Sequence, residues 1–321
     1  MRQRRRNPRT VLVLAAGLLL AAACSDNEEG TADGSAVSDT GTPATEVTAP
    51  ATTDGGGSPT SGGATTGSGA STTSAPAALD GETWRVVLVA DDDTLAVRQQ
   101  ADPASTKIGE LAWDAEGVTT TGQTGSHNGQ PWYEVTTGST AGWVNAAYLT
   151  PQVTAAEFAA DPEPEALVDE LAGVLQARGD LRPLVSAHGL YVDDRPRLLR
   201  FTTDELAGIL TDTTVRSWIG PACGSPCLSA TFAEHIAVPF LSAYDDTDTT
   251  VTVDDLASGP SSRIPESIVR PELAGFHHVT VFDPGDDPAA DGLDWSTWYV
   301  YLDREPDGWK IVALSNDVWA P

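Results

Sequence analysis

The order of apolar and polar positions divides the chain into four stretches. An apolar run, Val11–Ala23, follows a basic N-terminus, and residues 25–80 then contain no aromatic side chain and only two valines. Residues 82–150 alternate short apolar runs with polar turns, whereas the rest of the chain mixes helical and strand periods. We predict a signal peptide (1–23), a linker (24–80) and two folded domains (82–152 and 155–321).

The first folded stretch has the pattern of a small β-barrel. Its apolar runs are short, and turn signals recur about every eight to twelve residues. The predicted strands are Trp84–Val89, Leu95–Arg98, Lys107–Leu111, Val118–Thr121, Trp132–Val135 and Ala141–Val144. This density of short strands predicts an all-β domain.

The second folded stretch opens with a helical pattern. Asp161 and Pro162 are typical of a helix start, and the apolar residues after them recur with helical spacing, which predicts a helix over residues 161–178. Two Thr-x-x-Glu capping boxes, Thr202–Glu205 and Thr231–Glu234, predict two further short helices.

Strand patterns dominate the end of the chain. Phe276–Phe282 alternates apolar and polar positions, and residues 296–302 and 309–314 form a predicted hairpin with Asp307-Gly308 as its turn signal. Shorter strands are expected at Leu184–Ser186 and around Trp218-Ile219. Helices followed by a curved antiparallel sheet predict an α+β domain, cone-shaped like cystatin-like folds.

The N-terminus has the features of a secretory signal. Five arginines precede the apolar run, which at about 20 Å of helix is too short to span a bilayer. Ala21-Ala22-Ala23-Cys24 resembles the lipobox of bacterial lipoproteins, although the family prefers leucine where Ala21 stands. The resemblance implies cleavage before Cys24 and lipid on its thiol, hence a protein anchored on the outer face of the cell membrane. An ordinary signal peptide with an incidental cysteine is the alternative.

The linker is rich in Thr, Ser, Gly, Ala and Pro. Such a segment cannot offset the entropy lost on ordering, so we expect it to be disordered, with a span of roughly 40 Å. This reach would carry the folded part away from the membrane and into the wall. Its hydroxyl side chains are also compatible with O-glycosylation.

The charge of the chain excludes one class of partner. The formal charge is −28, and removal of the signal would leave 13 basic against 46 acidic residues, a charge of −33. Such a surface repels phosphate backbones, so nucleic-acid binding is excluded. The low lysine content fits life in high salt, but an acidic fold with this linker gives the same composition.

With Cys24 lipidated, two of the three cysteines remain. Cys223 and Cys227 are separated by Gly and Pro residues that favour a tight turn, and outside the cell they are expected to be oxidised. We predict a small structural disulfide between them.

Motifs in the first folded stretch resemble the bacterial SH3-like (SH3b) domain. They are Leu95-Ala96-Val97-Arg98, Ile108-Gly109-Glu110-Leu111, Gly117-Val118, Trp132-Tyr133-Glu134-Val135 and Gly142-Trp143-Val144-Asn145-Ala146-Ala147-Tyr148-Leu149. Ala96 stands where the family often has asparagine, and Gln99-Gln100 replaces Ser-Gly. The resemblance implies a small barrel that binds peptidoglycan or its stem peptides.

The same resemblance places the ligand groove between the loop after Arg98 and the loop Ser126–Pro131. Candidate ligand residues are Trp113, Trp132, Arg98 and Tyr148. Exposed aromatic rings stack on sugar or peptide faces. The alternative is that Trp132, like Trp143, belongs to the barrel core, and that the module serves as a spacer.

The second folded stretch is similar to an uncharacterised domain of Gram-positive surface lipoproteins. The resembling pieces are Val185-Ser186-Ala187-His188-Gly189-Leu190, Asp294-Trp295-Ser296, Gly308-Trp309 and Asn316-Asp317-Val318-Trp319. Leu293 and Asn316 depart from the family pattern, and the family implies no activity.

Signals for catalysis in this part are weak. A cysteine peptidase would need a free thiolate beside a histidine, but the Asp-Cys-Ser-Gly motif of wall peptidases is absent and both cysteines are expected in a disulfide. The domain histidines lack zinc-site spacing. Adjacent strand residues point to opposite faces, so we expect one of His277 and His278 to be buried and the other exposed.

Acidic clusters offer one further hypothesis. Asp245–Asp248, Asp254-Asp255 and Asp283–Asp294 contain oxygen ligands of the kind calcium takes, but none has the spacing of a calcium loop, and solvated acidic loops explain them equally. Asp294 and Asp317 are a candidate pair for sugar hydrolysis. The alternative is that they cap turns.

The sequence as a whole favours a non-catalytic, lipid-anchored envelope protein that binds peptidoglycan or wall peptides. A wall-modifying hydrolase with its site in residues 155–321 and an extracellular interaction scaffold for another envelope protein are the alternatives. No cofactor and no metal are expected.

Overall fold

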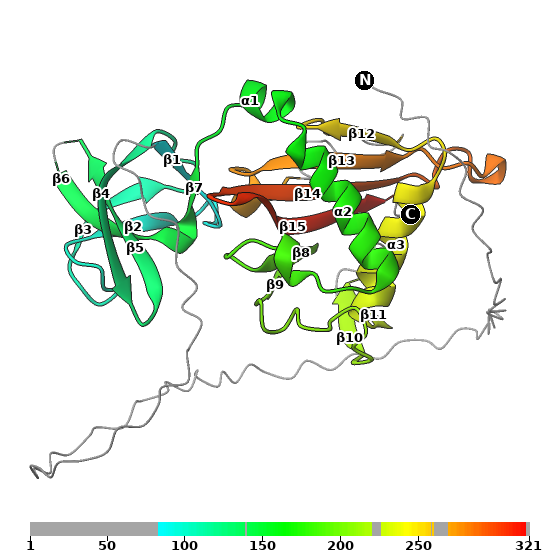
Figure 1. The fold of residues 1–321 in the computed structure, drawn as a ribbon, viewed down its shortest axis with the longest axis horizontal. Helices are drawn as coiled ribbons and strands as arrows, with labels where there is room; N and C mark the ends of the chain where they lie inside the picture. The colour runs from blue at the N-terminus through cyan, green and yellow to red at the C-terminus, as the bar shows by residue number, and fades with distance from the viewer. Residues whose placement is uncertain (1–82, 139, 220–225, 258, 260–268, 319–321) are drawn as a thin grey trace, which may run out of the picture. The chain divides into compact units, whose positions relative to one another are not determined.

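The chain folds mainly into β-structure, with a curled sheet, a mixed sheet and few helices (Figure 1). The computed structural model describes residues 83–138, 140–219, 226–257, 259 and 269–318. The predicted signal peptide, the linker, Cys24 and Cys223 lie outside the described residues. No described helix is long and apolar enough to cross a membrane.

The curled sheet comes first. Its strand order is β3-β2-β6-β5-β4-β1-β7, and all neighbours are antiparallel. The strands are β1 (Thr83–Val86), β2 (Thr94–Arg98), β3 (Lys107–Ala112), β4 (Val118–His127), β5 (Gln130–Thr137), β6 (Thr140–Asn145) and β7 (Leu149–Pro151), with the 3₁₀ turn η1 (Ala146–Tyr148) before β7. The six predicted strands are confirmed, although β1 ends earlier than expected.

Alternation along these strands builds one apolar interior. Leu95 and Val97 of β2, Tyr133 and Val135 of β5 and Val144 of β6 are all buried in the same cluster. Burial of each such side chain stabilises the fold by roughly 1.5–3 kcal/mol. The residues between them therefore face away from this interior.

The mixed sheet has the order β12-β13-β14-β15-β8-β9. Its strands are β8 (Leu190–Asp194), β9 (Arg197–Phe201), β12 (Thr250–Val253), β13 (His277–Asp283), β14 (Ser296–Glu305) and β15 (Gly308–Val318). The predicted β14–β15 hairpin and its antiparallel neighbour β13 are confirmed. The sheet is mixed because β8 lies parallel to β15. The sequence predicted an antiparallel sheet and contains no local signal for this pairing. A separate two-stranded ribbon joins β10 (Arg216–Ile219) to β11 (Pro226–Ala230).

In the part of the chain that the structure describes, three α-helices accompany the mixed sheet: α1 (Ala155–Ala160), α2 (Glu163–Ala177) and α3 (Val238–Asp245). The helix predicted over residues 161–178 is α2, and the Asp161 carboxylate accepts from the Glu163 amide at 2.9 Å. The Thr231 capping box also opens a helix, which starts as a π turn, η3 (Ala233–Ala237). Pro239, in the first turn of α3, has no N–H for the carbonyl four residues earlier, which favours this wider turn.

Two of the predicted secondary-structure elements are absent from the described residues. The Thr202–Glu205 capping box forms, but only turns follow it, because Gly208 takes φ +70° and interrupts the helical path. The strand predicted at Leu184–Ser186 is the end of a 3₁₀ turn, η2 (Arg182–Leu184), and a single bridge from Val185 to Ile311. Two more 3₁₀ turns, η5 (Pro271–Leu273) and η6 (Pro288–Ala290), flank β13.

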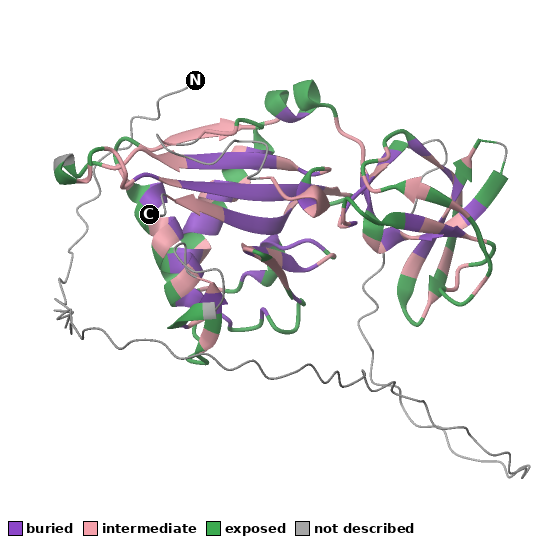
Figure 2. Cartoon of the chain, turned by 180° about the vertical axis from the view of Figure 1, so that it is seen from behind, coloured by how far each residue is buried: buried purple, intermediate pink, exposed green. Residues whose placement is uncertain are grey.

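The central strands of the mixed sheet are largely buried (Figure 2), and its two faces are covered differently. Helices α2 and α3 cover one face, where Val279, Val281, Trp298 and Val300 join the main apolar cluster. The opposite face holds buried polar side chains from alternate positions. These are His278, Thr280, Thr297, Tyr299, Tyr301 and Ser315.

The segment after β12 lies against this polar face. The Ala257 carbonyl accepts from Thr297 Oγ1 at 3.1 Å and from the Tyr299 hydroxyl at 3.0 Å, and the Asp255 carbonyl accepts from Thr280 Oγ1 at 2.5 Å. Backbone carbonyls thus satisfy hydroxyls that an apolar covering would leave without partners.

Candidate functional site

Two loops of the curled sheet meet at one edge of its outer face. The loop between β2 and β3 (Gln99–Thr106) is closed by a hydrogen bond from the Gln99 amide to the Thr106 carbonyl at 2.9 Å. Its Asp102 carboxylate lies 3.7 Å from Nδ1 of His127, at the tip of the β4–β5 hairpin. These are the two loops that the sequence resemblance names as the walls of a groove. We call this surface, with Arg98 and Trp143, the loop face.

Trp143 lies between these loops and was not predicted as a site residue. A Cβ added at Gly125 of β4 would lie 2.7 Å from the Cβ of Ala101 and 2.9 Å from Cζ3 of Trp143, so glycine is what lets the loop, the strand and the indole approach. Gly142 and Val144 on either side are buried, whereas Trp143 is half-buried. Alternation around Val144 is the signal that could have placed this indole outside the core.

Arg98 stands beside Trp143 in the sheet. β2, β6 and β5 are in register here, so Arg98, Trp143 and Glu134 form one row across the outer face. Nη1 of Arg98 donates to the Ser105 carbonyl at 2.7 Å, which holds the loop, and the guanidinium retains further donors. The structure therefore places this predicted ligand residue on the loop face.

The other predicted ligand residues are placed less favourably. Trp132 is buried, yet its neighbour Tyr133, not Trp132, belongs to the apolar cluster of the curled sheet, so Trp132 lies on the outer side of β5. Trp113 packs at the edge of that cluster. Tyr148 is 37% exposed, and its carbonyl accepts from the Val87 amide at 3.0 Å.

A seam joins the curled sheet to the mixed sheet and the segments around it. The Leu88 amide donates to the Glu272 carbonyl at 2.8 Å, and Nη1 of Arg85 donates to the Gly275 carbonyl at 3.0 Å. A Cβ at Gly275 would lie 2.6 Å from Cγ1 of Val87, so glycine permits the close approach. Val87 shares an apolar cluster with Tyr299 and other residues of the mixed sheet.

Asp303 of β14 is the polar centre of this seam. Its Oδ1 accepts from Thr150 Oγ1 of β7 at 2.5 Å, and its Oδ2 accepts from Ser186 Oγ at 3.1 Å and lies 3.1 Å from Nε2 of His188. Burial opposes charge on both titratable groups, but the His188 contact lowers the pKa of Asp303 and the Asp303 contact raises the pKa of His188. The pair is therefore held in its ionised form.

The Ser186, His188 and Asp303 side chains do not form a nucleophile–base relay. In such a relay the serine hydroxyl donates to the imidazole. Here the Ser186 hydroxyl donates to the carboxylate and accepts from the His188 backbone amide at 3.1 Å. The imidazole contacts the same carboxylate oxygen, so no base among the described residues activates Ser186.

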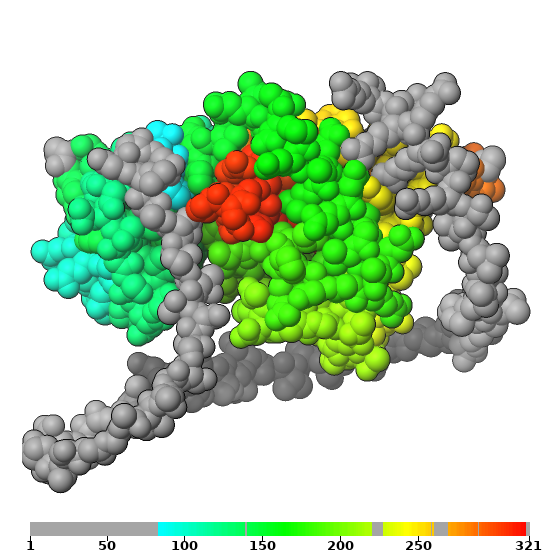
Figure 3. Space-filling model, in the orientation of Figure 1, coloured from blue at the N-terminus to red at the C-terminus, as the bar shows by residue number. Residues whose placement is uncertain are grey.

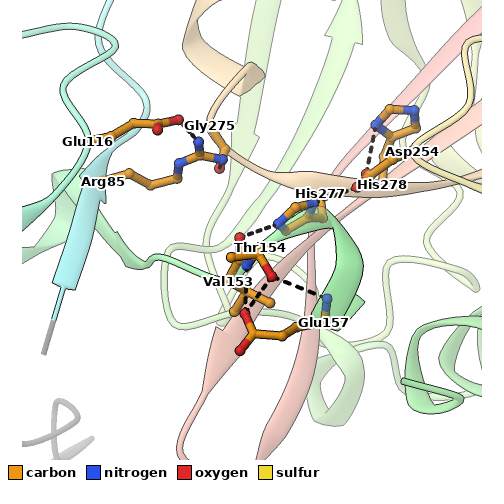
Figure 4. A network of polar contacts seen from close by, with 9 residues as sticks. All are labelled: Arg85, Glu116, Val153, Thr154, Glu157, Asp254, Gly275, His277 and His278. Carbon is orange, nitrogen blue, oxygen red and sulfur yellow. Dashed lines mark hydrogen bonds and ion pairs between the residues drawn. The ribbon is translucent and has the colours of Figure 1, made fainter. Parts of the chain in front are cut away.

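His277 forms a second polar centre at the start of β13 (Figure 4). Its Nδ1 lies 2.6 Å from Oδ2 of Asp254, and its Nε2 lies 2.8 Å from the carbonyl oxygen of Val153, just after β7. The ring stacks on Phe158 of α1 with centroids 4.6 Å apart. Burial lowers the pKa of His277, but the Asp254 and Val153 contacts outweigh it and raise the pKa overall.

The expectation that one of the adjacent histidines is exposed was wrong. His278 is buried on the polar face of the sheet, and the His277 side chain is 13% exposed because α1 and the Val153 segment cover it. The pKa of His278 is lowered, chiefly by burial.

Asp294 and Asp317 lie near the start of β14 in different settings. Oδ2 of Asp294 accepts from the backbone amides of Asp286 and Asp287 at 2.9 and 2.7 Å, and these bonds lower its pKa. Asp294 thus closes a turn, as the alternative to a catalytic pair predicts. Asp317 lies within β15, opposite Thr297.

No group of three or more His, Cys, Asp or Glu side chains among the described residues is arranged to hold a metal ion. Two of the acidic residues that sequence offered for calcium are engaged within the fold: the Asp246 carboxylate accepts from the Asp248 amide at 2.8 Å, and Asp254 contacts His277. Cys227 is disulfide-bonded in the structure, and the predicted partner, Cys223, lies outside the described residues.

Comparison of the chain with protein-family models, with curated proteins and with solved structures finds no match.

Proposed function

We propose that this chain is a lipid-anchored cell-envelope protein whose N-terminal folded part, an SH3-like domain, binds peptidoglycan or its stem peptides without catalysing a reaction. The loop face is the observation that carries this proposal. The Gln99–Thr106 loop and the tip of the β4–β5 hairpin meet beside a half-buried indole, where the resemblance expects a ligand groove. The motif at Cys24 supplies the anchor, and the linker supplies the reach.

The chemistry of the loop face suits a wall ligand. The half-buried Trp143 ring can stack on a sugar or peptide face, and the remaining donors of Arg98 suit the carboxylates of stem peptides. The nearest acidic residue in the same row is Glu134. Its Oε2 accepts a hydrogen bond from Thr121 Oγ1 at 2.7 Å rather than from Arg98.

Two observations favour binding over hydrolysis among the described residues. The hydroxyl of Ser186 is directed at a carboxylate rather than at an imidazole, and Asp294 is occupied by the two backbone amides of a turn. Neither arrangement provides an activated nucleophile or an acid–base pair facing across a cleft.

Co-sedimentation of the full chain carrying Cys24→Ser with purified peptidoglycan sacculi tests the proposal. Point variants are preferable to isolated domains, because cutting the chain would expose the buried carboxylate of Asp303. We expect retention by wild type and at least a tenfold weaker affinity for Trp143→Ala, since truncation of an aromatic hot-spot residue costs about 2 kcal/mol or more and about 1.4 kcal/mol is tenfold.

Trp113→Ala is the matched control. It removes an indole of the same curled sheet from the edge of the core and should leave the affinity unchanged if the variant is folded. No retention of wild type above an acidic control protein would refute wall binding. Equal losses in both tryptophan variants would refute the assignment to the loop face.

A further inference from the structure

Two histidines lie at the seam, each against a carboxylate of the mixed-sheet part. His188 precedes β8, and His277 opens β13, so both belong to the mixed-sheet part of the chain. One ring nitrogen of each contacts a carboxylate of that part, Asp303 or Asp254. The other nitrogen of His277 meets the Val153 carbonyl, in the segment that leaves the curled sheet. Burial opposes the charge on His188, but a backbone contact with Ala147, just before β7, adds to the effect of Asp303 in raising its pKa.

We propose that His188 and His277 form a pH-sensitive joint, in which the two protonated imidazolium rings clasp the curled sheet to the mixed sheet and loosen the seam when they lose their protons. The two sheets themselves stay folded in the loosened state.

The geometry around His277 requires the doubly protonated ring. A neutral imidazole has one N–H donor and one lone pair, whereas an imidazolium has two donors. Both partners of His277, the Asp254 carboxylate at 2.6 Å and the Val153 carbonyl at 2.8 Å, are acceptors. Deprotonation therefore turns one of these hydrogen bonds into a lone-pair repulsion.

The charged groups around each ring favour the proton. Asp303 and Glu305, both on β14, face His188. Around His277 lie Asp254, which attracts the proton, and Arg85 of β1, which opposes it. Burial lowers the pKa of the neighbouring His278, which weakens its repulsion of the proton on His277.

The direction of the pH effect follows from these surroundings. Both histidines have a pKa raised above the ordinary value of 6.5. The seam is therefore fully closed below about pH 6.5 and weakens as the pH rises through the folded-state values. The opening constant should increase by up to about tenfold per pH unit for each histidine. Apolar contacts of Val87 with Leu273 and Phe276 do not titrate and limit how far the seam opens.

Amide hydrogen exchange in the full chain carrying Cys24→Ser tests the joint. The Leu88 amide reports on the seam because it donates to the Glu272 carbonyl across it, and the Val135 amide inside the curled sheet is the internal reference. After correction for the intrinsic pH dependence of exchange, protection of the Leu88 amide should fall more than tenfold between pH 6 and pH 8.5, while the Val135 amide keeps its protection.

Replacement of both histidines by glutamine removes the titrating groups. The variant His188→Gln/His277→Gln should show an open seam with no pH dependence. His235→Gln, at a ring that stacks on Trp218, is the matched control and should behave like wild type. A flat Leu88 profile in wild type, or an unchanged pH dependence in the double variant, would overturn the proposal.

A second measurement needs no variant. The imidazole proton resonances of His188 and His277 in wild type should titrate over the same pH range in which Leu88 loses protection. Titration of both rings well below that range would equally overturn the joint.

Discussion

The curled sheet and the mixed sheet bury their strands in different ways. In the curled sheet the apolar side chains turn inwards, as Val97 and Val135 do, and the outer face carries Arg98 and Trp143. In the mixed sheet both faces are buried, one under helices and the other with polar side chains such as Tyr299. A one-sided sheet is stable through its apolar interior alone, whereas a two-sided sheet also depends on each buried polar group finding its partner.

The seam is where the two kinds of burial meet, and it should be the most sensitive point. Asp303→Ala removes a buried carboxylate that accepts from Thr150 and Ser186 and contacts the charged His188. We expect a loss of about 3–5 kcal/mol in the free energy of unfolding, because the histidine charge is left without a partner. Chemical denaturation at pH 6 measures it, and Asp303→Asn, which keeps one acceptor, should lose less. A loss below about 1 kcal/mol would contradict this view of the seam.

Asp303 also contributes to the loss of stability in acid. Its pKa is lowered in the folded state, so its contribution is present above the unfolded value near 4 and is lost as the pH falls below it.

In the curled sheet, we expect the largest loss of stability from a substitution that overpacks the contact between strands. A Cβ added at Gly142 would lie 2.6 Å from Cγ1 of Val97, 2.8 Å from Cδ1 of Ile108 and 3.0 Å from the Arg98 carbonyl oxygen. Gly142→Ala should cost about 1–3 kcal/mol in unfolding free energy. The matched control is Gly173→Ala in α2, where an added Cβ meets nothing within 4 Å, and this variant should be neutral or stabilising. Gly129 is unsuitable as a control because its φ of +79° would strain an alanine. Equal losses in both variants would count against a tightly packed β2–β6 contact.

The smallest expected difference in unfolding free energy is between variants of two tyrosines on the polar face of the mixed sheet. The Tyr299 hydroxyl donates to the Ala257 carbonyl, whereas the buried Tyr301 hydroxyl has no hydrogen-bond partner among the residues that the structure describes. Tyr299→Phe should cost about 1 kcal/mol, and Tyr301→Phe should be neutral or slightly stabilising. Thermal or denaturant unfolding of the two variants side by side measures the difference. The reverse order would show that the partners on this face are assigned wrongly.

Local patterns predicted those elements whose cause is local. Alternation found the strands of the curled sheet and the β14–β15 hairpin, and helical spacing with Asp161 found α2. The Thr202 capping box shows the limit of such signals, since a cap satisfies amides but does not prevent Gly208 from ending the helical path.

The polar centres could not be predicted because their members are far apart in the sequence. Ser186 and Asp303 are separated by 117 positions, and Val153 and His277 by 124. The parallel pairing of β8 with β15 also joins segments that are far apart in the sequence. On the loop face, Arg98 was identified from a motif, whereas Trp143 was considered only as a core residue, although Gly142 and Val144 on either side of it are the buried positions of β6.

Residue-resolved mapping of ligand contacts tests the proposed function most directly. The full chain carrying Cys24→Ser, labelled with ¹⁵N, would be titrated with soluble muropeptides. We predict saturable shifts of the Trp143 indole and of amides in residues 99–106 and 126–131, with the mixed sheet unaffected. Shifts confined to residues 155–318, or no shifts at millimolar muropeptide, would contradict the assignment of wall binding to the loop face.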